Sequence, residues 1–199
     1  MSHTAMLKPG FSEPVHASQQ VFRRALTALA EPGQVQSVTN APALDALDPA
    51  TYVLCLCLLD SDTSVWLSPA LDTPTLRANL AFHCGCPIVA QPELAAFALL
   101  TANDAAQLPA FNPGTDRDPD LSCTLLIQLA SLTGGPSATW QGPGIRDKRA
   151  MSLPLPESFW AKRDAHGFPK GLDCFLTAGE AFVGLPRSTR VTRMMQEVI

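Results

Sequence analysis

The sequence is poor in charged residues and has no long apolar run. Charged side chains make up 16% of its 199 residues, against about 25% in an average globular domain. The 14 basic and 18 acidic side chains form no run of one sign, which argues against nucleic acid or anionic lipid as a partner. The longest strongly apolar stretch, residues 52–59, is too short to span a bilayer. We therefore expect no membrane and no nucleic acid, and a surface partly covered by another protein chain.

Cysteine is too scarce for a disulfide-bonded fold, with six in the whole chain. The first 15 residues lack the apolar core of a signal peptide, so we expect a cytoplasmic protein with reduced, buried thiols. His83, Cys84 and Cys86 have the spacing of metal ligands, but no second pair nearby completes a four-ligand site. We therefore predict that no metal binds here. The alternative to a metal ligand is that His83 lies at a helix end beside small buried thiols.

The expected helices begin mostly at a serine or aspartate cap, with a proline close behind it. Ser12 and Pro14 open a helix that Pro32 ends, and its apolar row of Val15, Phe22, Leu26 and Leu29 is expected to face the core. Asp48 before Pro49 predicts a second helix, buried over residues 52–59. Asp72 is expected to cap a third helix that reaches His83, and a fourth is predicted over residues 157–165.

Strands are expected between these helices, at residues 34–39, 65–68, 87–90, 97–101, 123–132, 137–141, 173–177 and 181–185. Gly134 and Gly135 predict a hairpin between residues 123–132 and 137–141, and residues 178–180 predict a second hairpin. Strands mixed with helices indicate an α/β layered sandwich with some antiparallel pairing. The length favours one domain over residues 1–199, with residues 1–12 and 192–199 as flexible tails.

Three segments, in order along the chain, point to one family. They are FRRALTALAEPG at residues 22–33, CTLLIQLASLTGG followed by QGPGI within residues 123–145, and FPKGLDCFLTAGEAFVGLPRSTRV at residues 168–191. Together they resemble the PhnH subunit of the bacterial carbon-phosphorus lyase system, which breaks down phosphonates. The resemblance implies a three-layer α/β/α sandwich with a mixed sheet, similar to the large domain of transferases that depend on pyridoxal phosphate (PLP).

The resemblance also implies function and partners. PhnH proteins lack PLP and its lysine, and Lys170 stands at the variable position of a Phe-Pro-x-Gly turn, so no cofactor is expected. The family forms a homodimer when isolated and a complex with PhnG, PhnI and PhnJ. With PhnG, PhnI and PhnL it supports transfer of a ribose 5-triphosphate unit from ATP to a phosphonate, which releases adenine. A pure assembly module and a stand-alone PLP-dependent transferase remain the alternatives.

Anion recognition is the chemistry that the basic residues of these segments favour. Arg23, Arg24, Arg187 and Arg190 lie inside the segments, and guanidinium forks suit phosphonate and triphosphate groups. The alternative for each arginine is a solvated side chain or a pair with a structural carboxylate. Asp173 is expected either to orient such an arginine or to cap a strand end. Gly142-Pro143-Gly144 matches ordinary turn chemistry better than a phosphate-binding loop.

Overall fold

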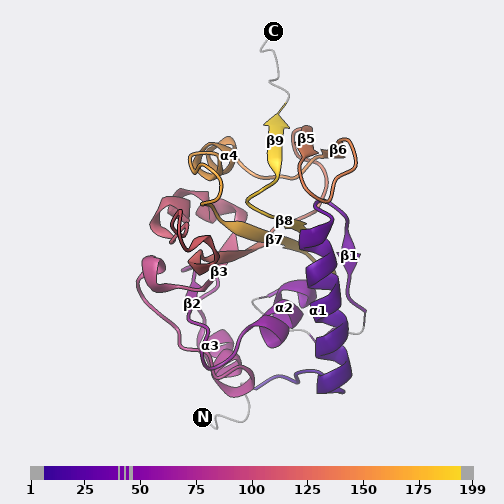
Figure 1. The fold of residues 1–199 in the computed structure, drawn as a ribbon. Coiled ribbons are helices and arrows are strands. Elements are labelled where there is room, and N and C mark those ends of the chain that lie inside the picture. The colour runs from indigo at the N-terminus through magenta and orange to yellow at the C-terminus, as the bar shows by residue number, and fades with distance from the viewer. Residues whose placement is uncertain (1–6, 40, 43, 45–46, 194–199) are drawn as a thin grey trace.

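The computed structural model describes residues 7–39, 41–42, 44 and 47–193, and its elements are labelled in Figure 1. The α-helices are α1 (Pro14–Ala30), α2 (Pro49–Leu58), α3 (Pro74–His83) and α4 (Glu157–Arg163). The strands are β1 (Gln36–Ser37), β2 (Val65–Leu67), β3 (Phe97–Thr101), β4 (Thr124–Gln128), β5 (Ala138–Gln141), β6 (Arg149–Met151), β7 (Asp173–Ala178), β8 (Ala181–Leu185) and β9 (Arg190–Arg193). Short 3₁₀ helices are η2 (Pro92–Leu94), η3 (Ala102–Ala110) and η4 (Pro119–Leu121).

A six-stranded mixed sheet forms the centre of the fold, in the order β1-β8-β7-β4-β3-β2. Strands β2, β3, β4 and β7 run parallel, while β8 is antiparallel to both of its neighbours, β7 and β1. The register places Leu126 beside Phe175 and Leu176 beside Val183. This arrangement confirms the α/β class and the mixed sheet.

Both faces of the sheet are buried, because successive side chains of each strand point to opposite sides. Leu126, Phe175 and Phe182 pack in the cluster that contains α1, α2 and α3. Leu125 and Leu176 pack in the cluster that contains η3, α4 and the small sheet β6-β5-β9. Figure 1 shows α2 and α3 on one side of β7 and β8, and α4, β5, β6 and β9 on the other. The layered sandwich is confirmed, and its second outer layer is partly a β-sheet.

Helix α1 presents a different face to the core from the one the sequence predicts. Its buried residues are Val21, Ala25 and Ala28. Of the expected core row, Val15, Phe22 and Leu26 are 80%, 47% and 53% exposed, and Leu29 alone packs against the core, partly buried. The cause lies in β8: a Cβ atom on Gly184 would be 2.3 Å from the carbonyl oxygen of Ala28. Helix and strand thus meet backbone to backbone, and only the face of α1 that carries small residues fits this approach.

The first predicted hairpin is wrong, and the second is confirmed. Strand β4 pairs in parallel with β3 and β7, while β5 belongs to the small sheet. Gly135 instead allows a close crossing, because a Cβ atom there would be 1.9 Å from the carbonyl oxygen of Leu153. Strands β7 and β8 form the expected hairpin, in which Ala178 pairs with Ala181 around Gly179 at a φ of +55°.

Several element boundaries also differ from the sequence expectation. Thr73, not Asp72, caps α3 by accepting a hydrogen bond from the Leu76 N–H, N···O 3.1 Å. Asp48 does precede α2, but its carboxylate accepts from the Gly179 N–H at 2.8 Å and makes no cap bond to the helix. Residues 87–90 contribute a single bridge, between Ile88 and Val65.

The ends of the chain are partly described. Residues 1–6 and 194–199 of the expected tails lie outside the described residues. Residues 7–12 run beside α3, where the Lys8 N–H donates to Asn79 Oδ1 at 2.8 Å, and Thr192 and Arg193 belong to β9. Within the described part of the chain, no helix has both the length and the apolarity to cross a membrane.

Candidate functional site

The three segments that carry the family resemblance meet at the C-terminal end of α1. The Gly33 N–H, from the first segment, donates to the carbonyl of Gly184 in the third, N···O 3.2 Å. Gly144, from the second segment, has a φ of +80°, and a Cβ atom on it would be 1.8 Å from the carbonyl oxygen of Ala30. Only glycine fits such an approach at positive φ. The most specific motifs of the sequence therefore build a packing junction.

Arg149 of β6 completes this junction. Its Nη1 donates to the carbonyl of Pro32 at 2.6 Å and to that of Glu31 at 3.2 Å. These carbonyls belong to the turn that follows α1, so Arg149 fixes this turn against β6 and places a positive charge near the negative dipole end of the helix. Arg149 lies outside the three segments, and sequence reasoning missed it.

A cavity of about 560 Å³ lies at the second and third segments and is lined by residues 141–143, 163–164, 166, 168 and 187–191. Its volume falls in the range of about 300–1,000 Å³ that is usual for ligand pockets. Its wall contains three arginines, Arg163, Arg187 and Arg190, and only one carboxylate, that of Asp164. The cavity wall therefore carries net positive charge.

Arg187 and Asp173 form a partly buried ion pair at the edge of this cavity. The Asp173 Oδ2 accepts from Nη2 of Arg187 at 2.6 Å and from Nε at 3.1 Å, while Oδ1 accepts from the Arg187 backbone N–H at 2.7 Å. The Arg187 Nη1 also donates to the carbonyl of Pro119. The two side chains are 15% and 20% exposed. Asp173 thus orients an arginine, and most donors of that arginine are already used.

Arg163, at the end of α4, is a cavity residue that sequence reasoning missed. It is 8% exposed, and its Nη2 donates to the carbonyls of Pro186 and Thr189 at 2.8 and 2.9 Å. These bonds fix the β8–β9 connection against α4. The Arg163 Nε and the Thr189 hydroxyl are buried without a hydrogen-bond partner among the described residues. The one sequence signal for Arg163 is its place in a predicted helix, outside the recognised segments.

Arg190 differs from the other two arginines of the cavity. It is exposed at the start of β9, and its backbone pairs with Gln141. Its guanidinium makes no hydrogen bond or ion pair with any residue that the structure describes. Arg190 is therefore the arginine of this wall whose donors are available to a ligand.

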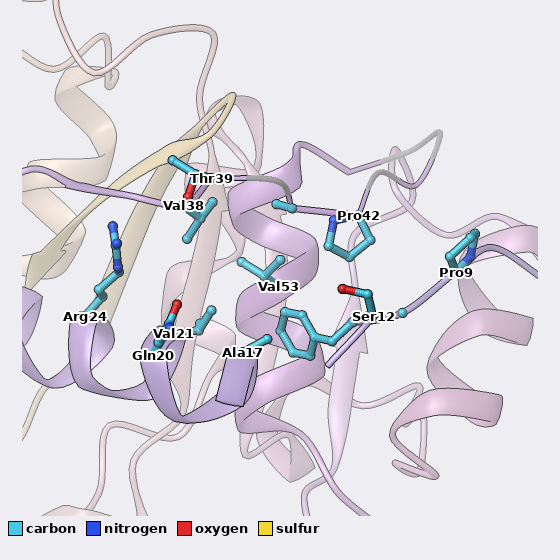
Figure 2. Close-up of a pocket in the computed structure, with 13 residues that line it drawn as sticks. Pro9, Ser12, Ala17, Gln20, Val21, Arg24, Val38, Thr39, Pro42 and Val53 are labelled. Atoms are coloured by element: carbon cyan, nitrogen blue, oxygen red, sulfur yellow. The ribbon is translucent and has the colours of Figure 1, made fainter. Parts of the chain in front are cut away.

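Arg23 and Arg24 point in different directions, as adjacent positions about 100° apart on a helix must. Arg23 is exposed. Arg24 is half-buried and lines a smaller pocket of about 230 Å³ between α1, residues 38–39 and 41–42, and the N-terminal segment. Figure 2 shows Arg24 and Gln20 at the end of this pocket that is remote from Pro9. The remaining lining is mainly apolar, so this pocket is a poorer site for a phosphate group.

His83 lies near the Arg24 pocket rather than in the arginine-lined cavity. Its Nε2 is 2.9 Å from the carbonyl oxygen of Lys8, and a Cβ atom on Gly10 would lie 3.1 Å from its ring. The ring also contacts Tyr52 and Phe82 edge to face. His83 thus holds the N-terminal segment that forms one wall of the pocket. Of the five predicted site residues, only Asp173 and Arg187 contact each other. Arg24 lines the smaller pocket, His83 supports its N-terminal wall, and Arg23 is exposed elsewhere on α1.

The cysteines lie in apolar surroundings. Burial raises the pKa of Cys57 to about 11 and that of Cys174 to about 12, and it raises the pKa of Cys55 and Cys123 further. A hydrogen bond between Cys84 and Cys86 raises the pKa of Cys84 and lowers that of Cys86. No group of three or more His, Cys, Asp or Glu residues among those described could hold a metal ion. The surroundings of Cys55, Cys57, Cys123 and Cys174 disfavour thiolate chemistry.

The lysines offer poor candidates for a Schiff base with PLP. All four lie in the described part of the chain, and none is buried. Lys170, in the third segment, forms an ion pair with Asp116 at 3.3 Å, and the Asp116 side chain is 75% exposed. A Schiff-base lysine needs a closed pocket that excludes water. The lysines of this chain do not fit that requirement.

Known proteins resemble the chain over nearly its whole length. The family model described as "Bacterial phosphonate metabolism protein (PhnH)" matches residues 9–192. The alpha-D-ribose 1-methylphosphonate 5-triphosphate synthase subunit PhnH of Rhizobium meliloti (strain 1021) is 37% identical over 191 residues, which cover 92% of this chain and 94% of the relative. The putative C-P lyase subunit protein HtxG of Stutzerimonas stutzeri is 27% identical over 179 residues, or 87% and 85% of the two chains. This chain therefore belongs to the PhnH family of bacterial phosphonate metabolism proteins.

Proposed function

We propose that this chain is an accessory subunit of the carbon-phosphorus lyase machinery, required for making alpha-D-ribose 1-methylphosphonate 5-triphosphate from ATP and methylphosphonate. The observation that carries the proposal is the 37% identity to a named subunit of that synthase, over 94% of the relative's length. In the reaction, the bond between the ribose and adenine of ATP is broken, and the ribose carbon is joined to an oxygen of the phosphonate.

The accessory role is supported by how the polar residues of the chain are used. Asp173 holds Arg187, and His83 holds the N-terminal segment. Nucleophilic catalysis needs a nucleophile beside a general base, and the thiols of Cys55, Cys57, Cys123 and Cys174 have raised pKa values. The chain contributes to the activity of a complex and lacks a complete active site of its own.

The partners that we propose are PhnG, PhnI, PhnJ and PhnL, in the cytoplasm. In isolation the chain forms a homodimer, consistent with its low charge density and with the apolar residues that it exposes on α1. Light scattering at micromolar concentration tests this point. A mass near 42 kDa, twice the 21.2 kDa of one chain, is expected, and a mass of one chain would contradict it.

Co-purification tests the proposed function. The tagged chain is expressed together with PhnG, PhnI and PhnJ of the same organism, and the eluted proteins are identified by mass. We expect all three partners in one complex. Elution of the tagged chain alone, with PhnG, PhnI and PhnJ together in the unbound fraction, would overturn the proposal.

A purely structural assembly subunit is the second candidate. It is favoured by one observation: the Nε, Nη1 and Nη2 of Arg187 all donate to Asp173 or to Pro119. Under that alternative, no small ligand binds to the chain.

A further inference from the structure

Arg24 is the exception among the arginines that are withdrawn from solvent. Five arginines are partly or fully buried, and four of them donate hydrogen bonds to carbonyls or carboxylates, namely Arg149, Arg163, Arg187 and Arg193. Arg24 makes no hydrogen bond or ion pair with any residue that the structure describes. A guanidinium that has lost part of its water without gaining a partner is unfavourable. An anionic acceptor bound beside Arg24 would supply the missing partner.

The pocket that Arg24 lines is polar at one end and aliphatic in its middle. Figure 2 shows Arg24 and Gln20 at the end remote from Pro9, and the side chains of Val21 and Val53 between the two ends. The side-chain amide of Gln20 adds a donor beside the guanidinium. This arrangement matches a ligand that has an anionic head and a short aliphatic body.

The size of the pocket restricts the ligand to a small molecule. Its volume of about 230 Å³ lies below the range of about 300–1,000 Å³ of ordinary ligand pockets. Four segments surround it: α1, α2, residues 38–39 with 41–42, and residues 9–12. His83 fixes the last of these through the carbonyl of Lys8, at 2.9 Å. An enclosed space of this size suits a free acid better than a segment of another protein.

The charge of the pocket favours a carboxylate over a phosphate or phosphonate group. Arg24 is the only basic residue among those that line it. A carboxylate carries a single charge and can accept two parallel hydrogen bonds from one guanidinium. A second negative charge would lie against aliphatic walls without a cation, where charge is costly to bury.

We propose that the Arg24 pocket binds a small aliphatic carboxylate, with its carboxylate against the guanidinium of Arg24 and its hydrocarbon chain between Val21 and Val53. The pocket packs against the helical side of the sheet, because Val21 and Val53 belong to the core cluster of α1, α2 and α3. The inference goes beyond the proposed function, which assigns the chain to a complex but gives it no ligand. Binding by the isolated chain does not depend on assembly, so either idea can fail without the other.

Nuclear magnetic resonance titration of the isolated chain, at constant ionic strength, tests the proposal. The probes are acetate, butyrate and hexanoate. We expect saturable binding with a dissociation constant for hexanoate of roughly 1–10 mM, as ligands of this size allow. Each added methylene group should tighten binding about two- to fourfold, because it buries apolar surface. No saturation by hexanoate below about 50 mM would overturn the proposal.

Three further probes with the same hydrocarbon chain test the head group. Hexylamine reverses the charge, 1-hexanol removes it, and hexylphosphonate replaces the carboxylate by a larger anion. All three should bind more weakly than hexanoate. Equal binding of hexylamine or 1-hexanol would mean that the chain binds without help from Arg24. Equal or tighter binding of hexylphosphonate would overturn the assignment to a carboxylate.

Matched variants locate the site. Arg24→Gln should raise the dissociation constant for hexanoate about tenfold, because the charged hydrogen-bonding partner is lost. Arg23→Gln removes the same charge from the neighbouring exposed position on α1, and should change the constant by no more than about twofold. Equal weakening by the two variants would mean diffuse attraction and would refute the assigned site.

A filling variant tests the aliphatic part of the pocket while Arg24 stays in place. Ala17 lines the pocket from α1 and is half-buried, so Ala17→Leu places a larger side chain in the open space. It should keep the melting temperature of the parent and lose hexanoate binding. Ala17→Ser, which adds little volume, is the control and should still bind. Undiminished hexanoate binding by Ala17→Leu would contradict the assigned location.

Discussion

The guanidinium of Arg187 and the carboxylate of Asp173 join the two ends of the β7–β8 hairpin. Asp173 begins β7, and Arg187 follows the end of β8, so the pair closes the open end of the hairpin. Both carboxylate oxygens accept from Arg187, at distances of 2.6 to 3.1 Å. The pair is a structural clamp beside the cavity, and it fixes where the chain enters the β8–β9 connection.

Asp173→Asn should destabilise the protein by about 3 kcal/mol, because removing one member of a mostly buried ion pair leaves the other charge without its partner. Equilibrium unfolding in urea measures the loss. Asp72→Asn is the matched control, since Asp72 and Arg77 form a similar two-bond pair whose side chains are 31% and 50% exposed. It should shift the unfolding midpoint little. Equal shifts in the two variants would refute a special role for the clamp.

Gly184→Ala should destabilise the fold at the upper end of the range of about 1–3 kcal/mol that is typical of overpacking. The added methyl group would lie 2.3 Å from the Ala28 carbonyl oxygen, so α1 must move away from β8. Gly167→Ala is the control, because that position has open space and no positive φ. Thermal unfolding of both variants measures the effect. A Gly184→Ala protein as stable as the parent would show that α1 is not held at backbone contact.

Elements that depend on contacts between residues close in sequence were predictable. The β7–β8 hairpin follows from two apolar strands around Gly179, whose turn conformation needs no distant partner. The core-facing side of α1 was not predictable from the helix alone. Its large apolar residues mark the wrong face, because the choice depends on Gly184, which is remote in sequence and contacts Ala28 only in the folded chain.

The residues of the candidate site also fall into those that the sequence predicted and those that it did not. Asp173 and Arg187 belong to one recognised segment, so their partnership was among the expectations. Arg163 and Arg149 were missed, because their hydrogen bonds go to backbone carbonyls of segments distant in sequence. A carbonyl is present at every residue, so no sequence pattern marks those that will receive an arginine.

Phe22→Ser combined with Leu26→Ser should leave the melting temperature nearly unchanged, since both side chains are about half exposed or more in the free chain. It should weaken assembly with the other subunits, because an apolar row on a helix face is the kind of surface that subunits bury. Pull-down of the partner subunits measures this. Leu94→Ser, at another exposed leucine, is the control. Normal assembly of the double variant would exclude this face as the contact.

Stability should fall as the pH rises above about 9. The folded pKa values of Cys57, near 11, and of Tyr52 and Cys174, near 12, lie above the ordinary values of 9.0 and 10.0, chiefly because of burial. The unfolded chain therefore releases these protons first, and the stability that the neutral groups contribute is lost as pH rises toward the folded values. Urea midpoints from pH 8 to 11 measure the fall. Cys57→Ala should make the fall shallower, and a flat profile in the parent would contradict these shifts.

The most direct test of the proposed function is an omission experiment. Purified PhnG, PhnI and PhnL are incubated with ATP and methylphosphonate, with and without this chain, and the release of adenine is measured together with the ribose 1-methylphosphonate 5-triphosphate that forms. We expect both products only when the chain is present, in equal amounts. Formation of both products at the same rate without the chain would contradict its assignment as a required subunit.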